Sequence, residues 1–97
     1  MVAKDVIVIN RKDNVATALQ TLGAGTLVQV EIQSRLEEVT LLSEIPEGHT
    51  FALKDIEEGG LVIKYGEPIG RSTAKIKPGA HVHVHNVVSP VKEGERP

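Results

Sequence analysis

The chain has 97 residues, which suits one domain, and 40% hydrophobic with 25% charged residues are typical of a folded soluble protein. The net charge is -2, no Lys/Arg run occurs, and aromatic residues that could stack on bases are nearly absent, which together argue against nucleic-acid binding. With one Phe, one Tyr and no Trp, the core is predicted to be aliphatic. No cysteine is present, which excludes disulfides and thiolate sites, and no signal peptide or membrane-length apolar stretch is apparent, so we expect a cytoplasmic protein without membrane contact.

The N-terminal part of the chain predicts a strand followed by a helix. Val6–Asn10 contains a short β-branched run typical of a strand. In residues 14–22, apolar side chains recur at i, i+3, i+4 and i+7, which is the spacing of one helix face. We therefore predict one short helix there, capped by Asp13 or Asn14.

The rest of the chain predicts short strands separated by glycine turns, and hence a mainly β fold. Polar and apolar residues alternate in Thr26–Gln33, as in a half-buried strand. Further strands are predicted at Val39–Leu42, His49–Leu53, Leu61–Ile63, Ile69–Ala74 and His81–Val87. We expect one domain over residues 1–88, and a polar tail or linker remnant over residues 89–97.

A motif of the form aliphatic-x-x-Gly occurs four times, each time shortly before a strand-like segment. It begins at Leu22, Ile45, Ile56 and Ile76. The motif predicts a tight turn in which the aliphatic side chain enters the core and the glycine adopts a positive φ. Repeated use of this turn indicates a compact β structure with sharp reversals.

The segment HVHVHN, residues 81–86, is the strongest chemical feature. In a strand, His81, His83 and His85 would share one face, with neighbouring Cα atoms about 6.5–7 Å apart. Two imidazoles at that spacing can converge on a metal, while a third contacts an anion or acts as acid or base. A polar solvent-facing strand is the alternative. With no Asp or Glu nearby in sequence, a shared site or a substrate contact is favoured over a metal held by this strand alone.

The segment IKYGEPIGR, residues 63–71, predicts two strands joined by a turn at Tyr65–Pro68. Lys64 and Arg71 flank the turn and could hold a carboxylate, and Tyr65 could donate a hydrogen bond. The pattern alone favours a plain hairpin with solvated charges.

His49 follows a glycine at a turn that enters a strand. It could join the other histidines in space, or be an ordinary turn histidine. No phosphate-binding loop, dinucleotide fingerprint or nucleophile elbow is present, so nothing indicates covalent catalysis.

Several segments, taken in order, resemble the N-terminal domain of altronate and galactarate dehydratases. They are Asp13–Leu19, Gly48–His49, Ala52–Gly59, Lys64–Gly70 and HVHVHN, and the resemblance covers roughly residues 6–88. The same unit occurs as a separate small subunit in some of these enzymes and, in a related form, in sulfolactate sulfo-lyase. The family often has lysine after the Gly-His pair, where this chain has Thr50, a departure that bears on substrate identity.

The resemblance implies a SAF-type β-clip with a small helix, and a reaction that removes water from a sugar acid to give a 2-keto-3-deoxy acid. It also implies a divalent metal (iron, manganese or magnesium) and a large catalytic subunit, without which this chain is expected to be inactive.

On this resemblance, site roles can be assigned to particular residues. Those expected to be catalytic are His81, His83 and His85; those expected to bind substrate are Lys64, Tyr65, Arg71, Asn86 and His49. The chain lacks an acidic cluster suited to a hard cation, so the main metal ligands are expected in the large subunit.

Three alternatives remain open at this stage. The chain could be the small subunit of a sulfolactate sulfo-lyase, a non-enzymatic SAF-type ligand-binding module, or a freestanding protein that binds metal or anions through its histidines. The sugar acid, and whether the chain forms a homo-oligomer, are equally open.

Overall fold

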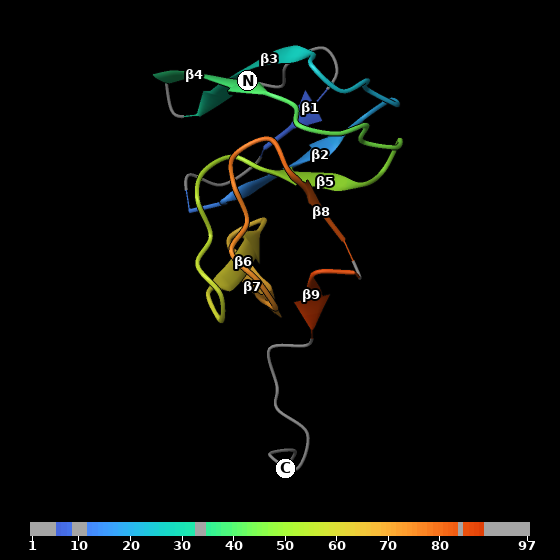
Figure 1. Ribbon diagram of the computed structural model, residues 1–97. Coiled ribbons are helices and arrows are strands. Elements are labelled where there is room, and N and C mark those ends of the chain that lie inside the picture. The colour runs from blue at the N-terminus through green and yellow to red at the C-terminus, as the bar shows by residue number, and fades with distance from the viewer. Residues whose placement is uncertain (1–5, 9–11, 33–34, 84, 89–97) are drawn as a thin grey trace.

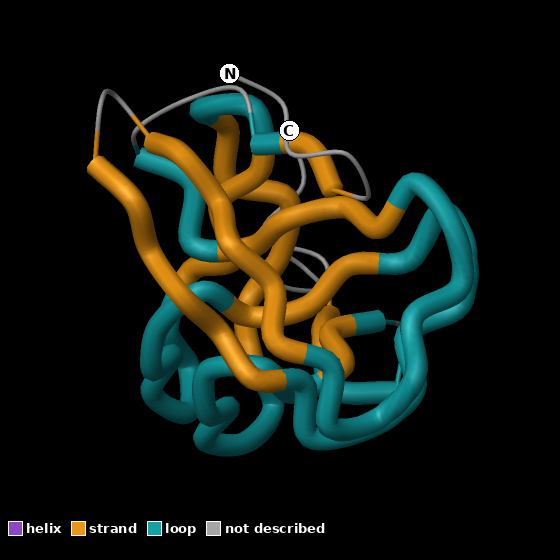
Figure 2. The backbone as a smooth tube through the Cα atoms, turned by 90° about the horizontal axis from the view of Figure 1, so that it is seen from above, coloured by secondary structure: helices purple, strands orange, loops and turns teal. Residues whose placement is uncertain are grey.

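All regular structure in the computed structural model is β-strand within the described residues, which are 6–8, 12–32, 35–83 and 85–88 (Figures 1 and 2). The strands are β1 (Val6–Ile7), β2 (Val15–Ala18), β3 (Leu27–Ile32), β4 (Arg35–Thr40), β5 (Thr50–Ala52), β6 (Leu61–Lys64), β7 (Glu67–Ser72), β8 (His81–Val82) and β9 (Val87–Val88). The mainly β class predicted from the sequence is confirmed. These residues contain no helix with the length and apolar character needed to span a membrane.

The strands form three antiparallel sheets arranged in layers (Figure 1). A four-stranded sheet of order β1-β2-β5-β8 lies in the middle. The β3–β4 hairpin lies on one side of it, and the three-stranded sheet β6-β7-β9 lies on the other. Both faces of the middle sheet are therefore covered, and its strands need apolar side chains on both faces.

The core consists of two apolar clusters, one on each side of the middle sheet. In β5, Phe51 belongs to the cluster shared with the β3–β4 hairpin, whereas its neighbour Ala52 belongs to the cluster shared with β6. In β2, Ala16 and Val15 are divided between the clusters in the same way. Apart from Phe51 the buried apolar residues are aliphatic, as the composition predicts.

The four aliphatic-x-x-Gly motifs form the turns that the sequence predicts. Their aliphatic residues are at most 6% exposed and pair across the fold as two isolated antiparallel bridges, Leu22 with Ile45 and Ile56 with Ile76. Their glycines have φ between 80° and 87°. Within each turn, the N–H after the glycine donates to the carbonyl three residues earlier, at 2.7–3.2 Å. A positive φ at the third position is the signature of a type II turn.

The helix predicted near residues 14–22 is wrong, because Val15–Ala18 is the inner strand β2, paired with β1 and β5. A strand buried on both faces does not alternate polar and apolar residues, so its apolar positions can match a helical spacing. A helix this short is also unstable in isolation, whereas β2 has pairing partners on both sides. Leu19, the residue at the i+4 position of the helical spacing that starts at Val15, is 45% exposed.

The predicted helix caps bind the β6–β7 hairpin instead. The Asp13 carboxylate, 1% exposed, accepts a hydrogen bond from Gly66 N at 2.7 Å. The Asn14 side chain accepts from Ile63 N and donates to Leu61 O, both at 2.8 Å. These contacts attach the hairpin to the start of β2.

Several predicted strand boundaries also change. β4 is Arg35–Thr40 where the sequence predicts Val39–Leu42, and β7 is Glu67–Ser72 where it predicts Ile69–Ala74. The strand predicted over His81–Val87 stops at Val82, and β9 begins only at Val87. Between the two strands, Asn86 N–H donates to His83 O at 3.0 Å. The turn between β6 and β7 is confined to Tyr65 and Gly66, which have φ of 56° and 79°, as in a type I′ hairpin turn. Asn10, Gln33 and the tail predicted over residues 89–97 lie outside the described residues.

Candidate functional site

Strand pairing brings histidines from distant parts of the sequence together. His49 ends one of the glycine turns, where its N–H donates to Pro46 O at 3.0 Å, and β5 begins at the next residue. In the antiparallel β5–β8 pair, Thr50 lies opposite Val82. Continuing this register by one residue puts His49 opposite His83.

The histidine cluster consists of His49, His81, His83 and His85. The rings of His49 and His83 are stacked with centroids 3.9 Å apart, and those of His49 and His81 are 5.1 Å apart. His49 Nδ1 lies 2.9 Å from His81 Nε2, within hydrogen-bonding distance. The ring of His85 lies 5.0 Å from that of His81, on the side of the turn before β9. All four histidines of the chain therefore meet in one place.

Electrostatics favour the neutral form of the central imidazole. Partial burial, followed by the positive charges of His85, His49 and His83, lowers the pKa of His81 below its usual value. No carboxylate pairs with these rings among the described contacts. His81 is therefore held in the form that can accept a proton.

Asn86 holds the backbone of the cluster in place. Its Nδ2 donates to His81 O at 2.9 Å, and its Oδ1 accepts from His83 N at 3.0 Å. Its own N–H donates to His83 O at 3.0 Å. The sequence analysis assigned Asn86 to substrate binding; in the structure its side-chain amide bonds to the two histidine backbones.

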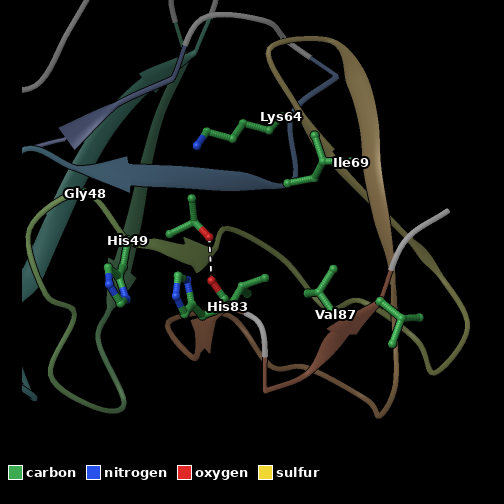
Figure 3. A pocket seen from close by; sticks show the side chains of 9 residues that line it. Gly48, His49, Lys64, Ile69, His83 and Val87 are labelled. Atoms are coloured by element: carbon green, nitrogen blue, oxygen red, sulfur yellow. Dashed lines mark hydrogen bonds between the residues drawn. The ribbon is translucent and has the colours of Figure 1, made fainter.

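A pocket of about 330 Å³ opens beside the cluster, between the middle sheet and the β6-β7-β9 sheet (Figure 3). His49 and His83 line one end, Ile69 and Val87 line the other, and Lys64 extends over it (Figure 3). The pocket therefore combines two imidazoles and an ammonium group with an apolar wall.

Thr50, at which the sequence analysis noted a departure from the resembled pattern, also lines the pocket. It is 8% exposed, and its hydroxyl donates to Val82 O at 2.6 Å (dashed in Figure 3). The hydroxyl therefore holds β5 to β8, and the cation at this pocket is Lys64.

The β6–β7 hairpin determines where its charged residues lie. Lys64 immediately precedes the turn that Asp13 holds, and its Nζ lies 5.2 Å from the centroid of the Tyr65 ring. Tyr65 itself is 46% exposed and is not among the pocket-lining residues. Arg71 lies opposite Leu61 at the far end of the hairpin, where its Nη1 donates to Gly59 O at 3.0 Å. The structure therefore does not bring Lys64 and Arg71 together.

The predicted catalytic histidines also differ in position. His83 lines the pocket directly. His81 does not line it but contacts His49, which does, and His85 lies next to His81. The sequence analysis did not identify Ile69 or Val87 as pocket residues, because only the packing of the sheets brings them there.

Comparison with known proteins agrees with this architecture. Residues 4–90 match the altronate/galactarate dehydratase SAF domain. The chain belongs to this family. The SAF domain is 51% identical over 80 residues to altronate dehydratase of Escherichia coli (strain K12), an alignment covering 82% of this chain and 15% of the relative. It is 36% identical over 83 residues to altronate dehydratase of Bacillus subtilis (strain 168), covering 86% of this chain and 16% of the relative.

A second group of relatives is shorter. The SAF domain is 46% identical over 48 residues to (2R)-sulfolactate sulfo-lyase subunit alpha of Paracoccus pantotrophus, covering 50% of this chain and 72% of that subunit. The chain thus spans about 15% of the length of the Escherichia coli altronate dehydratase and most of the sulfo-lyase subunit. The named relatives are lyases, and the resemblance predicted from the sequence is confirmed.

Proposed function

We propose that this SAF domain is the small subunit of a hydro-lyase, and that with a large catalytic subunit it converts an altronate-like sugar acid into a 2-keto-3-deoxy acid. The observation that carries the proposal is the pocket in which Lys64 faces the imidazoles of His49 and His83. A sugar acid has a carboxylate for the ammonium group and hydroxyls for imidazole nitrogens.

The reaction requires two proton transfers. A base removes the proton from the carbon next to the carboxylate, an acid protonates the departing β-hydroxyl, and the resulting enol becomes the 2-keto group. Charge develops on the carboxylate as the proton leaves, and a nearby cation stabilises it. In this proposal Lys64 pairs with the carboxylate, His83 contacts the substrate, and His81 accepts protons through His49. His85 has a supporting role beside His81.

The divalent metal implied by the family would add Lewis acidity at the substrate oxygens. The donors in this chain fit only part of the proposed metal range. The group of His49, His81 and His83 offers imidazole nitrogen, which suits iron, and no acidic cluster of the kind magnesium prefers accompanies it in the described residues. We therefore assign the ligands of a hard cation to the large subunit.

A second candidate is the small subunit of a sulfolactate sulfo-lyase. It is favoured by the 72% of the Paracoccus subunit alpha that this chain covers. The designation of that relative as a subunit also supports a partner chain. In that reaction sulfite would leave in place of water, and the same pocket would hold the carboxylate.

The test is to use the untagged chain as bait in extract of its native source and identify bound proteins by mass spectrometry. We expect one larger protein in constant ratio, and conversion of altronate or galactarate to a 2-keto acid only when both chains are present. Sulfite release from sulfolactate would select the second candidate. If the chain is folded and abundant in the extract but no partner protein is recovered with it, both candidate functions are contradicted.

The proposal includes a cytoplasmic location. Fractionation of the native source should recover the chain with soluble cytoplasmic markers, and recovery outside the cell would contradict this part of the proposal.

A further inference from the structure

Three imidazoles of the histidine cluster are close enough to share one ion. One ligand atom from each of His49, His81 and His83 lies within 4.8 Å of the others. Tetrahedral zinc with bonds of about 2.0–2.1 Å has donors about 3.4 Å apart, so shifts of roughly 1 Å would complete the geometry. We propose that these three histidines bind one divalent transition-metal ion of the class that prefers imidazole nitrogen, such as Zn²⁺, Ni²⁺, Co²⁺ or Fe²⁺.

The backbone of the proposed site is held in place before any ion binds. The N–H of His49 is bound within its glycine turn, and Asn86 bonds to the backbones of both His81 and His83. Binding would then require mainly side-chain rotations, including separation of His49 Nδ1 from His81 Nε2, which are now 2.9 Å apart. A site held in this way loses little conformational entropy on binding.

The donor set selects the class of metal. Mg²⁺ and Ca²⁺ require oxygen ligands, and the described residues place no carboxylate in this group. Imidazole suits zinc, copper, iron and nickel. The ring of His83 has no hydrogen-bond partner within the described part of the chain, so its nitrogens are accessible to an ion.

Three protein ligands leave a fourth position for water or a small ligand, as in catalytic zinc sites. His49 and His83 also line the pocket, so the open position would face it and the ammonium group of Lys64. An anion such as a hydroxy acid could then contact both cations. The metal site depends only on this chain and not on the proposed reaction. With an ion bound, the three imidazoles would act as ligands in place of the proton-accepting and substrate-contacting roles proposed above.

The test is calorimetric titration of the chelator-treated chain, without a histidine tag, with Zn²⁺, Ni²⁺ and Mg²⁺ at pH 7.5. We expect one Zn²⁺ or Ni²⁺ per chain with a Kd of about 1 µM or tighter, and no heat from Mg²⁺. Co²⁺ should give the visible absorption bands of nitrogen coordination. These readouts need neither a partner nor a substrate, so they are independent of the test of the proposed function.

Matched glutamine variants identify the ligands. His49→Gln and His83→Gln should each weaken Zn²⁺ binding more than about tenfold, since even loss of a group behind a ligand weakens binding about 10–100-fold. His85→Gln, outside the three-donor group, should change the Kd less than about threefold. His83 is exposed, so its replacement should preserve the fold, which the thermal unfolding midpoint checks. Absence of Zn²⁺ binding, equal Mg²⁺ binding, or equal effects of His83→Gln and His85→Gln would each overturn the proposal.

Discussion

At the scale of single residues, partial burial and three neighbouring imidazoles make protonation of His81 unfavourable. Its lowered pKa arises from partial burial first and then from its three neighbours. The unfolded chain has no such neighbours, so its His81 takes up a proton at the ordinary pKa of about 6.5. The contribution of neutral His81 to the free energy of unfolding is therefore fully present above about pH 6.5. It is lost as the pH falls from there toward the lower pKa of His81 in the folded protein.

We expect the free energy of unfolding of the metal-free protein to fall as the pH is lowered below about 6.5. The His81→Gln variant should have a flatter profile, because it lacks this titration. Urea denaturation at several pH values in the presence of a chelator measures both profiles. If the free energy of unfolding falls equally with pH in the two proteins, His81 does not contribute to the pH dependence of stability.

Asn86 is expected to act through the histidine backbones. Asn86→Ala removes two side-chain hydrogen bonds and should lower the free energy of unfolding by about 1–2 kcal/mol. As a control, Lys75→Ala removes an exposed ion pair with a separation of 3.9 Å and should change it by less than about 0.5 kcal/mol. Histidine ring NMR should show altered shifts for His81 and His83 only in the Asn86 variant. Unchanged shifts would contradict the positioning role.

At the scale of elements, the glycine turns are chemically similar but differ in what surrounds them. Gly25 and Gly79 have φ of 85° and 87°. A Cβ at Gly25 would meet no atom within 4 Å, whereas one at Gly79 would lie 2.0 Å from Thr40 O. Both positions demand an unusual φ, but only Gly79 also allows a close approach of two backbone segments.

Gly25→Ala should therefore lower the free energy of unfolding by about 1–2 kcal/mol, through backbone strain alone. Gly79→Ala should lower it clearly more, because β4 must also move. Denaturation of the two variants under identical conditions measures the difference. Equal losses would mean that the contact with Thr40 relaxes without strain.

Element prediction from the sequence succeeded where a local rule determines the conformation. Each aliphatic-x-x-Gly motif forms a turn because glycine alone adopts the required φ readily. Prediction failed at β2, where apolar residues on both faces imitate a helical spacing. The strand predicted over His81–Val87 failed for a different reason, since Asn86 closes a turn that β-branched alternation does not reveal.

At the scale of the whole molecule, the pocket exists because two sheets meet. Lys64 belongs to the hairpin that Asp13 and Asn14 attach to β2, whereas His49 and His83 flank the β5–β8 pair. The two hairpin cations therefore differ: Lys64 lines the pocket, and Arg71 bonds to a backbone carbonyl outside it.

Under the proposed function, Lys64→Met in the enzyme reconstituted with the proposed large subunit should lower kcat/KM about 10- to 100-fold, because one charge-assisted hydrogen bond to the substrate carboxylate is lost. Arg71→Met should change it less than about threefold, because its guanidinium bonds to Gly59 outside the pocket. Steady-state kinetics on the sugar acid, with partner binding checked by gel filtration, measures both. Equal losses in the two variants would place the carboxylate elsewhere.

The sequence by itself determined the features that depend on local chemistry. Composition dictated an aliphatic core, the glycine motifs dictated the turns, and HVHVHN together with the Lys-Tyr-Gly segment identified the family. Only the tertiary structure decided that His49 stacks on His83 and that Lys64, not Arg71, faces them. Those contacts join residues separated by many positions, and their formation depends on strand register and sheet packing, which local sequence patterns do not encode.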